Sequence, residues 1–106
     1  MRNYILIVED DNEINHMLRE LLQNQKFVTE SAFSGTEALL YLKNEMPTAV
    51  ILDLMLPGMN GEQLLEEIKK INPEISVIVA SAKDDVSTRI KLLKAGADDF
   101  IVKPFD

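Results

Sequence analysis

Five short apolar runs alternate with four helical patterns along this chain, and no other feature constrains its fold as strongly. Runs such as "YILIV" (4–8) and "AVIL" (49–52) are too short and too aliphatic for helices and are typical of buried strands. We therefore expect strands at 4–8, 27–32, 49–52, 75–80 and 99–102, the second of them at a sheet edge. Strict alternation of strands and helices predicts one parallel sheet that right-handed crossovers cover on both faces.

Capping signals and apolar spacing mark the helices between these strands. The first helix shows a stripe at i, i+3, i+4, i+7 and i+8 spacing: Ile14, Met17, Leu18, Leu21 and Leu22. Ser34 with Glu37 forms an S-x-x-E capping box for the second helix, and Asn60 with Gln63 suggests a similar cap for the third. Asp84 or Asp85 can cap the fourth helix, whose apolar positions and terminal glycine are Val86, Ile90, Leu93 and Gly96.

Composition narrows the class of protein. A length of 106 residues predicts one domain, and no apolar run approaches the ~20 residues that a membrane span needs. A net charge of -7 disfavours direct nucleic-acid binding by this segment, because phosphates favour Lys and Arg. With no cysteine, disulfides and thiolate metal sites are excluded, and a reducing cytoplasm fits.

Polar residues stand where the predicted strands end: Glu9-Asp10-Asp11, Ser31, Asp53, Ser81 and Lys103. In open parallel sheets, functional groups collect at the carboxyl ends of the strands. Carboxylates within ~5 Å of each other repel by roughly 3 kcal/mol per pair at an effective dielectric near 20. Protonation, Lys103 or a divalent cation must relieve this repulsion, and oxygen-only ligands favour Mg²⁺. A carboxylate beside Mg²⁺ and a lysine can attack phosphorus to form an aspartyl phosphate.

Four motifs in this order resemble the signatures of bacterial two-component response-regulator receiver domains of the CheY-like superfamily. They are "ILIVEDD", "ILDLMLPGMNG", "VIVASA" and "KAGADDFIVKPF", and together they cover essentially the whole chain. The resemblance implies a flavodoxin-like, doubly wound sheet of five parallel strands in the order 2-1-3-4-5.

Carried over residue by residue, the resemblance also implies the roles of the strand-end residues. Asp53 matches the phosphoacceptor, and the Mg²⁺ (or Mn²⁺) ligands would be Glu9, Asp10, Asp53 and the Met55 backbone carbonyl. The phosphoryl group would meet Lys103, the Ser81 hydroxyl and the Ala82 backbone amide.

Further positions in the resemblance concern switching and reset. Ser81 and Phe100 match the switch pair, and the Lys103–Pro104 peptide would be cis. Met55 and Lys83 flank the approach of the hydrolytic water and would tune its rate. His16 lies off the apolar stripe of the first helix, so we expect a solvated residue and not a phosphodonor.

At the level of the whole chain, the resemblance implies a cytoplasmic phosphorelay switch that a sensor histidine kinase phosphorylates, and not an enzyme acting on outside substrates. "KAGADDFIVKPF" is most similar to regulators with a winged-helix DNA-binding domain. We thus expect a homodimer through the fourth helix and fifth strand, and transcriptional output through a C-terminal domain. Residues 1–106 would be a receiver domain that stops before or at the start of its fifth helix, with the effector domain absent.

Other interpretations of the same residues exist. Asp53 alone would more often be a turn residue, and Glu9-Asp10-Asp11 could be only a helix N-terminus that attracts negative charge, with Asp11 as its cap. A degenerate receiver would dock partners without phosphorylation. An aspartyl-nucleophile phosphohydrolase, resembling the haloacid dehalogenases, would need a second acid two residues after Asp53, where Met55 stands.

Overall fold

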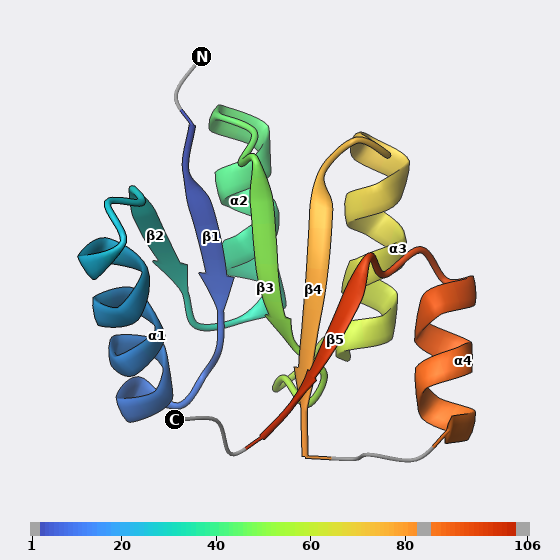
Figure 1. Cartoon of the computed structure of the whole chain (residues 1–106). Helices are drawn as coiled ribbons and strands as arrows, with labels where there is room; N and C mark the ends of the chain where they lie inside the picture. Colours follow the sequence, from blue (N-terminus) through green and yellow to red (C-terminus); the bar gives the residue numbers. More distant parts are fainter. Residues whose placement is uncertain (1–2, 83–85, 104–106) are drawn as a thin grey trace.

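A five-stranded parallel sheet runs through the middle of the molecule (Figure 1), whose computed structural model describes residues 3–82 and 86–103. The strands are β1 (Ile5–Val8), β2 (Thr29–Ala32), β3 (Ala49–Asp53), β4 (Ser76–Ser81) and β5 (Asp99–Val102). Their order is β2-β1-β3-β4-β5, and every neighbouring pair is parallel. The predicted α/β fold and strand order are confirmed, and β2 lies at an edge as predicted.

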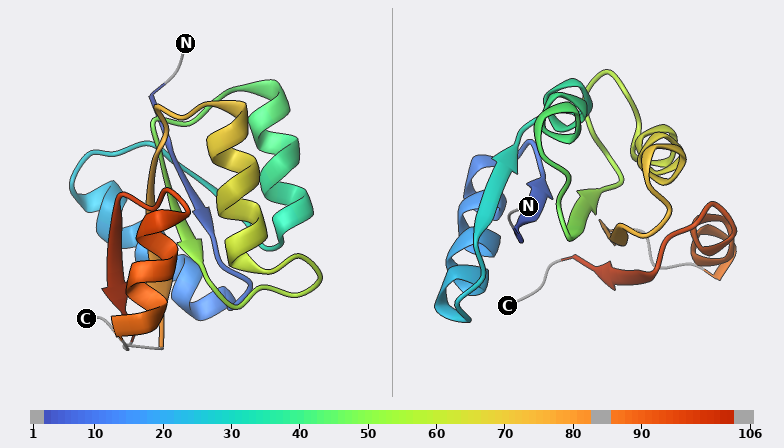
Figure 2. Two further views of the ribbon diagram at one scale, coloured as in Figure 1. Left: turned by 90° about the vertical axis from the view of Figure 1, so that its right-hand side faces the viewer. Right: turned by 90° about the horizontal axis from the view of Figure 1, so that it is seen from above.

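Four helices cover the two faces of the sheet. They are α1 (Asn12–Asn24), α2 (Gly35–Asn44), α3 (Gly61–Ile71) and α4 (Val86–Lys94). Figure 2 shows α1 on one face and α2 and α3 on the other, with α4 at the end of that row beside β5. None of the helices in the described ranges is long and apolar enough to cross a membrane.

Alternate side chains of β1 and β3 enter two separate cores, as the period of two requires. On β1, Leu6 and Val8 join the large core under α2 and α3, whereas Ile7 packs against Leu18 of α1. The central strands are therefore buried on both faces, which explains why their sequences are nearly continuous apolar runs.

The predicted capping residues begin the helices. The Asp11 carboxylate accepts hydrogen bonds from the backbone N–H groups of Glu13 (2.9 Å) and Ile14 (3.1 Å), so Asp11 is the cap of α1. Ser34 caps α2 by accepting from the Glu37 N–H (3.2 Å), but the return bond from the Glu37 side chain that a capping box needs is not formed. Asn60 with Gln63 forms a complete reciprocal capping box at α3. Asp84 and Asp85 lie outside the described residues.

Helix α4 presents its apolar residues differently from the sequence-based prediction. Val86, Ile90 and Leu93 are 72%, 48% and 52% exposed, while Leu92 is 1% exposed and enters the large core. Gly96 follows the helix with φ +112°, in the backbone region that favours glycine, as the predicted C-terminal position requires. The end of α4 was predicted correctly, but its apolar positions do not form its buried face.

Candidate functional site

Three carboxylates meet at the carboxyl edge of the sheet. Glu9 and Asp10 directly follow β1 and Asp53 ends β3, and one oxygen of each lies within 4.8 Å of the others. The paired strands bring them together, because Val8 stands opposite Leu52 in the register of β1 and β3. Glu9 and Asp53 are buried (2% and 5% exposed), whereas Asp10 is exposed. The predicted convergence of these strand ends is confirmed.

Lys103 brings a positive charge from β5 to the same place. Its Nζ donates to Glu9 Oε1 and lies 3.1 Å from Asp53 Oδ1, and its side chain is only 16% exposed. The Lys103 backbone N–H donates to the Ser81 carbonyl (2.9 Å), which holds the end of β5 against β4. Residues 9, 53 and 103, far apart in sequence, thus form one buried ion-pair cluster.

Removal of these charged groups from water, together with their contacts to one another, shifts the pKa values of Glu9 and Lys103. Burial raises the pKa of Glu9 from 4.5 to about 7; the hydrogen bond from Lys103 opposes this rise, and the nearby Asp53 adds to it. Burial lowers the pKa of Lys103, but its hydrogen bonds with Glu9 and Asp53 outweigh that effect and leave this pKa above its usual 10.5. One ammonium group cannot balance three carboxylates, so the cluster favours a further cation.

The donor set fits a hard divalent cation. Carboxylate oxygens are the groups that Mg²⁺ prefers, and the cluster contains neither sulfur nor imidazole. Around a cation with Mg–O distances of about 2.1 Å, ligand oxygens lie about 3–4.2 Å apart. The limit of 4.8 Å among these three oxygens is close to that range, and the exposed Asp10 can adjust. Glu9, Asp10 and Asp53 could therefore hold Mg²⁺ with waters completing its shell.

The remaining predicted phosphoryl-site residues lie along the same edge. Ser81 ends β4 and is 1% exposed. Ala80, the residue before Ser81, stands opposite Asp53 in the register of β3 and β4. Ala82, directly after Ser81, is exposed. Met55 is 69% exposed, and its backbone N–H lies 3.3 Å from the Asp53 Oδ1 that accepts its hydrogen bond.

Sequence reasoning missed one buried polar residue, Asn15 of α1. Its Nδ2 donates to the Glu9 carbonyl (3.0 Å), and its Oδ1 accepts from the Ser31 hydroxyl (2.6 Å). Asn15 thus ties α1 to the ends of β1 and β2 behind the carboxylates, and Ser31 supports the site through Asn15. The sequence did contain a signal for this role. Asn15 stands three residues before Leu18 and seven before Leu22, a spacing that places its amide on the buried face of an amphipathic helix.

Other predicted residues lie elsewhere. Phe100 is half-buried on β5, with the guanidinium carbon of Arg89 5.1 Å from its ring centre. His16 is exposed as predicted; its Nε2 is 3.1 Å from Glu20 Oε1, and its Nδ1 is 3.0 Å from Arg19 Nη2. Lys83 and Pro104 lie outside the described residues, so the rate-tuning role and the cis peptide stay predictions.

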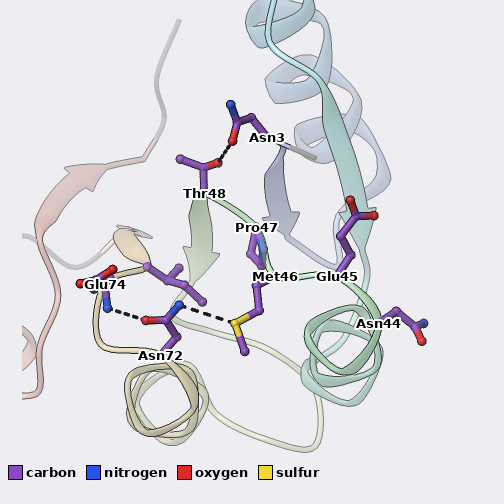
Figure 3. Close-up of a pocket in the computed structure, with 9 residues that line it drawn as sticks. Asn3, Asn44, Glu45, Met46, Pro47, Thr48, Asn72 and Glu74 are labelled. Carbon is purple, nitrogen blue, oxygen red and sulfur yellow. Dashed lines mark hydrogen bonds between the residues drawn. The ribbon is translucent and has the colours of Figure 1, made fainter. Parts of the chain in front are cut away.

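A hollow of about 520 Å³ lies at the opposite edge of the sheet, where β3 and β4 begin and α2 and α3 end (Figure 3). Hydrogen bonds join residues of its lining, from Thr48 Oγ1 to Asn3 Oδ1 (3.4 Å), from Asn72 Nδ2 to Met46 Sδ (3.5 Å) and from the Glu74 N–H to Asn72 Oδ1 (2.9 Å). The amino ends of the strands border this hollow, so it is separate from the carboxylate cluster at their carboxyl ends.

Comparisons with known proteins agree with this geometry. The family model described as the response regulator receiver domain matches residues 5–106. Response regulator MprA of Mycobacterium sp. (strain KMS) is 38% identical over 101 residues, which are 95% of this chain and 44% of that protein. The chain therefore spans less than half the length of this curated relative.

Solved structures show the same fold. The CheY-like receiver domain protein from Methanospirillum hungatei JF-1 superposes with a TM-score of 0.92 at 31% identity, covering 100% of this chain and 85% of that one. A BeF3-activated DrrB receiver domain superposes with a TM-score of 0.90 at 34% identity, covering 100% of this chain and 88% of that one.

Proposed function

The chain belongs to the response regulator receiver family, and from this premise we propose that Asp53 accepts a phosphoryl group from a partner histidine kinase in a Mg²⁺-dependent transfer. A receiver domain is a signalling module of two-component systems and not an enzyme in the usual sense. The observation that carries the proposal is the meeting of Glu9, Asp10 and Asp53 within 4.8 Å, with Lys103 paired to two of them.

The transfer follows from the positions of these groups. An Asp53 carboxylate oxygen attacks phosphorus, the phosphorus–nitrogen bond of the phosphohistidine breaks, and the imidazole leaves with the bonding electrons. Lys103 neutralises charge on the transferring group and exchanges its present carboxylate partners for phosphoryl oxygens. Bound Mg²⁺ would supply the remaining neutralisation, and its ligands would be Glu9, Asp10, Asp53 and the Met55 carbonyl.

The signal would be a change in the equilibrium between two conformations. The Ser81 hydroxyl and the Ala82 amide would bond the new phosphoryl oxygens, and Phe100 would turn inward. Moving the active state from 1:99 to 99:1 needs about 5.5 kcal/mol of differential stabilisation. One hydrogen bond to a charged group contributes only about 1.5–3 kcal/mol, so the lysine, the metal and repacking must contribute the rest. Hydrolysis of the acyl phosphate, with Met55 and Lys83 beside the water's path, would reset the switch.

Beryllofluoride, a mimic of the phosphoryl group, tests the proposal directly. We expect wild-type protein to bind it only with Mg²⁺ present, with chemical-shift changes at the backbone amides of residues 53, 81 and 82 in ¹⁵N NMR spectra. Asp53→Asn should abolish these changes because the acceptor oxygen is lost. Glu66→Gln, an equal charge change on the exposed face of α3, is the matched control and should behave as wild type.

Two results would contradict phosphoacceptor function. If wild type does not bind beryllofluoride, the result would favour a degenerate docking module. If Asp53→Asn binds it as well as wild type does, Asp53 is not the phosphoacceptor. Turnover of outside phosphate esters would favour a phosphohydrolase, although Met55 stands where that mechanism needs an acid.

For the whole protein we propose a cytoplasmic regulator with a transcriptional output. The chain spans less than half of MprA. The resemblance of "KAGADDFIVKPF" to winged-helix regulators supports a receiver of residues 1–106 that works with a DNA-binding domain outside them. The exposed Val86, Ile90 and Leu93 of α4 support a homodimer through α4 and β5. Two charges near that surface have partners within the chain, since Lys91 pairs with Glu62 (3.1 Å) and Asp98 with Lys69 (2.8 Å).

A further inference from the structure

Arg89 of α4 covers the ring of Phe100 on β5. Its guanidinium carbon lies 5.1 Å from the ring centre, within the range of a cation–π interaction. The half-buried Phe100 packs on one side against the large core, and Figure 1 shows α4 beside β5. The aromatic ring therefore lies between the core and a positive charge on the neighbouring helix.

The buried face of α4 is small in the part of the chain that the structure describes. Within the described residues, Leu92 is the single residue of this helix that is fully buried. The ion pair between Lys91 and Glu62 joins α4 to α3, but the lysine side chain is 68% exposed, and exposed pairs contribute little. The contact between Arg89 and Phe100 is consequently a direct link between α4 and β5.

The ring of Phe100 lies on the same face of the sheet as Ser81. In the register of β4 and β5, Phe100 stands opposite Val79, and Ser81 stands opposite Val102. Alternate residues of a strand point to the same face, so these four side chains share the face that α4 covers. In the proposed function the ring turns further into this layer, away from the guanidinium that lies over it here.

We propose that Arg89 is a positioning residue that couples the ring position of Phe100 to α4 and stabilises the unphosphorylated conformation. This inference rests on the proposed function, in which Phe100 turns inward when Asp53 is phosphorylated. Inward rotation breaks the cation–π contact, and α4 loses this link to β5 at the same moment. The change at β5 is thereby transmitted to the exposed apolar surface of α4 formed by Val86, Ile90 and Leu93.

The first experiment uses the unphosphorylated protein without Mg²⁺. Phe100 is replaced by phenylalanine analogues with one, two or three ring fluorines, which weaken the negative face of the ring stepwise while keeping its shape. We expect amide hydrogen exchange in α4 to become faster with each fluorine, by about two- to fivefold over the series. In an Arg89→Met background the dependence should vanish. The coupling would be overturned if the exchange rates in α4 do not change with fluorination, or if they change equally in the wild-type and Arg89→Met backgrounds.

The second experiment measures Mg²⁺-dependent beryllofluoride affinity. Arg89→Met should raise it about two- to fivefold, because the unphosphorylated state loses a contact worth that factor. Arg89→Lys, which keeps a cation, should have nearly the wild-type beryllofluoride affinity. In a Phe100→Leu background, Arg89→Met should not change the affinity. Equal affinities for wild type and Arg89→Met, or additive effects of the two changes, would overturn the proposal. If wild type binds no beryllofluoride, the proposed function and the switching role of Arg89 are both contradicted. The fluorine series still decides whether the contact between Arg89 and the Phe100 ring stabilises α4.

Discussion

Burial favours the protonated form of the Glu9 side chain, whereas metal binding requires its ionised form. Its side chain is 3% exposed, and burial raises its pKa to about 7 even though Lys103 donates to it. A bound divalent cation would reverse this preference, since it stabilises the ionised form. Protonation of Glu9 and cation binding are thus alternative ways to reduce the repulsion between Glu9 and Asp53.

The pH dependence of stability follows from this shift at the residue scale. Because the pKa of Glu9 is 4.5 when exposed and about 7 in the folded protein, the folded state binds more protons between those values. The contribution of Glu9 to the free energy of unfolding is therefore full below pH 4.5 and is lost as pH rises through 7. In urea titrations without Mg²⁺, Glu9→Gln should gain stability relative to wild type between pH 5 and pH 8.

Glu66→Gln serves as the control for this measurement, because it removes an exposed carboxylate of the same charge. Its difference from wild type should stay constant over the same pH range. A pH-independent difference for Glu9→Gln as well would show that Glu9 is not the titrating group.

At the scale of elements, the start of α3 determines the path of the chain immediately after Asp53. The Gly61 N–H donates to the Leu54 carbonyl (2.9 Å), and a Cβ added to Gly61 would lie 2.6 Å from Leu54 Cα. Helix α3 thus sits directly on the backbone that follows the proposed phosphoacceptor. Glycine is required here because of this close approach and not because of backbone conformation.

Gly61→Ala should therefore lower the free energy of unfolding by about 1–3 kcal/mol, because backbone must move to admit the methyl group. The same movement should shift the NMR signals of the amides at 53–55. Gly58→Asn is the control, since Gly58 has φ +78° with open space around a Cβ, and Asn tolerates that conformation. It should cost less than about 1 kcal/mol. A Gly61→Ala protein with wild-type stability in urea would contradict the close approach.

At the scale of the whole molecule, a net charge of -7 is partly concentrated at one edge of the sheet. A ligand that binds only the folded state stabilises it by mass action. Mg²⁺ at about ten times its dissociation constant should add about 1.4 kcal/mol. For a domain of about 100 residues that corresponds to a rise in Tm of about 6–11 °C.

Thermal unfolding with and without Mg²⁺ measures this shift, and NaCl at equal ionic strength controls for general screening. Asp10→Asn should reduce the shift, because one ligand oxygen loses its charge, whereas Asp99→Asn on β5 should leave it intact. An equal rise with NaCl, or an undiminished rise in Asp10→Asn, would contradict a magnesium site at these carboxylates.

Much of the architecture could be predicted from local patterns. The caps at Asp11, Ser34 and Asn60 were predictable because a cap and the N–H groups it accepts from lie within three residues. The alternation of strands and helices predicted the parallel sheet, and the resemblance supplied its strand order. The meeting of Glu9, Asp53 and Lys103 followed from the geometry of parallel strands, whose carboxyl ends share one edge.

Contacts between distant residues could not be predicted in this way. The bonds from Asn15 to Glu9 and Ser31 join two strands and a helix, and no spacing in the sequence specifies them. The sequence by itself determined the order and type of the elements and which edge carries the charges, because local hydrogen bonding and apolar periodicity control both, although β2 begins at Thr29 and not at the predicted residue 27. Only the tertiary structure decided that α4 buries Leu92, exposes Ile90 and places Arg89 over Phe100, because the burial of a helix face depends on what packs opposite it.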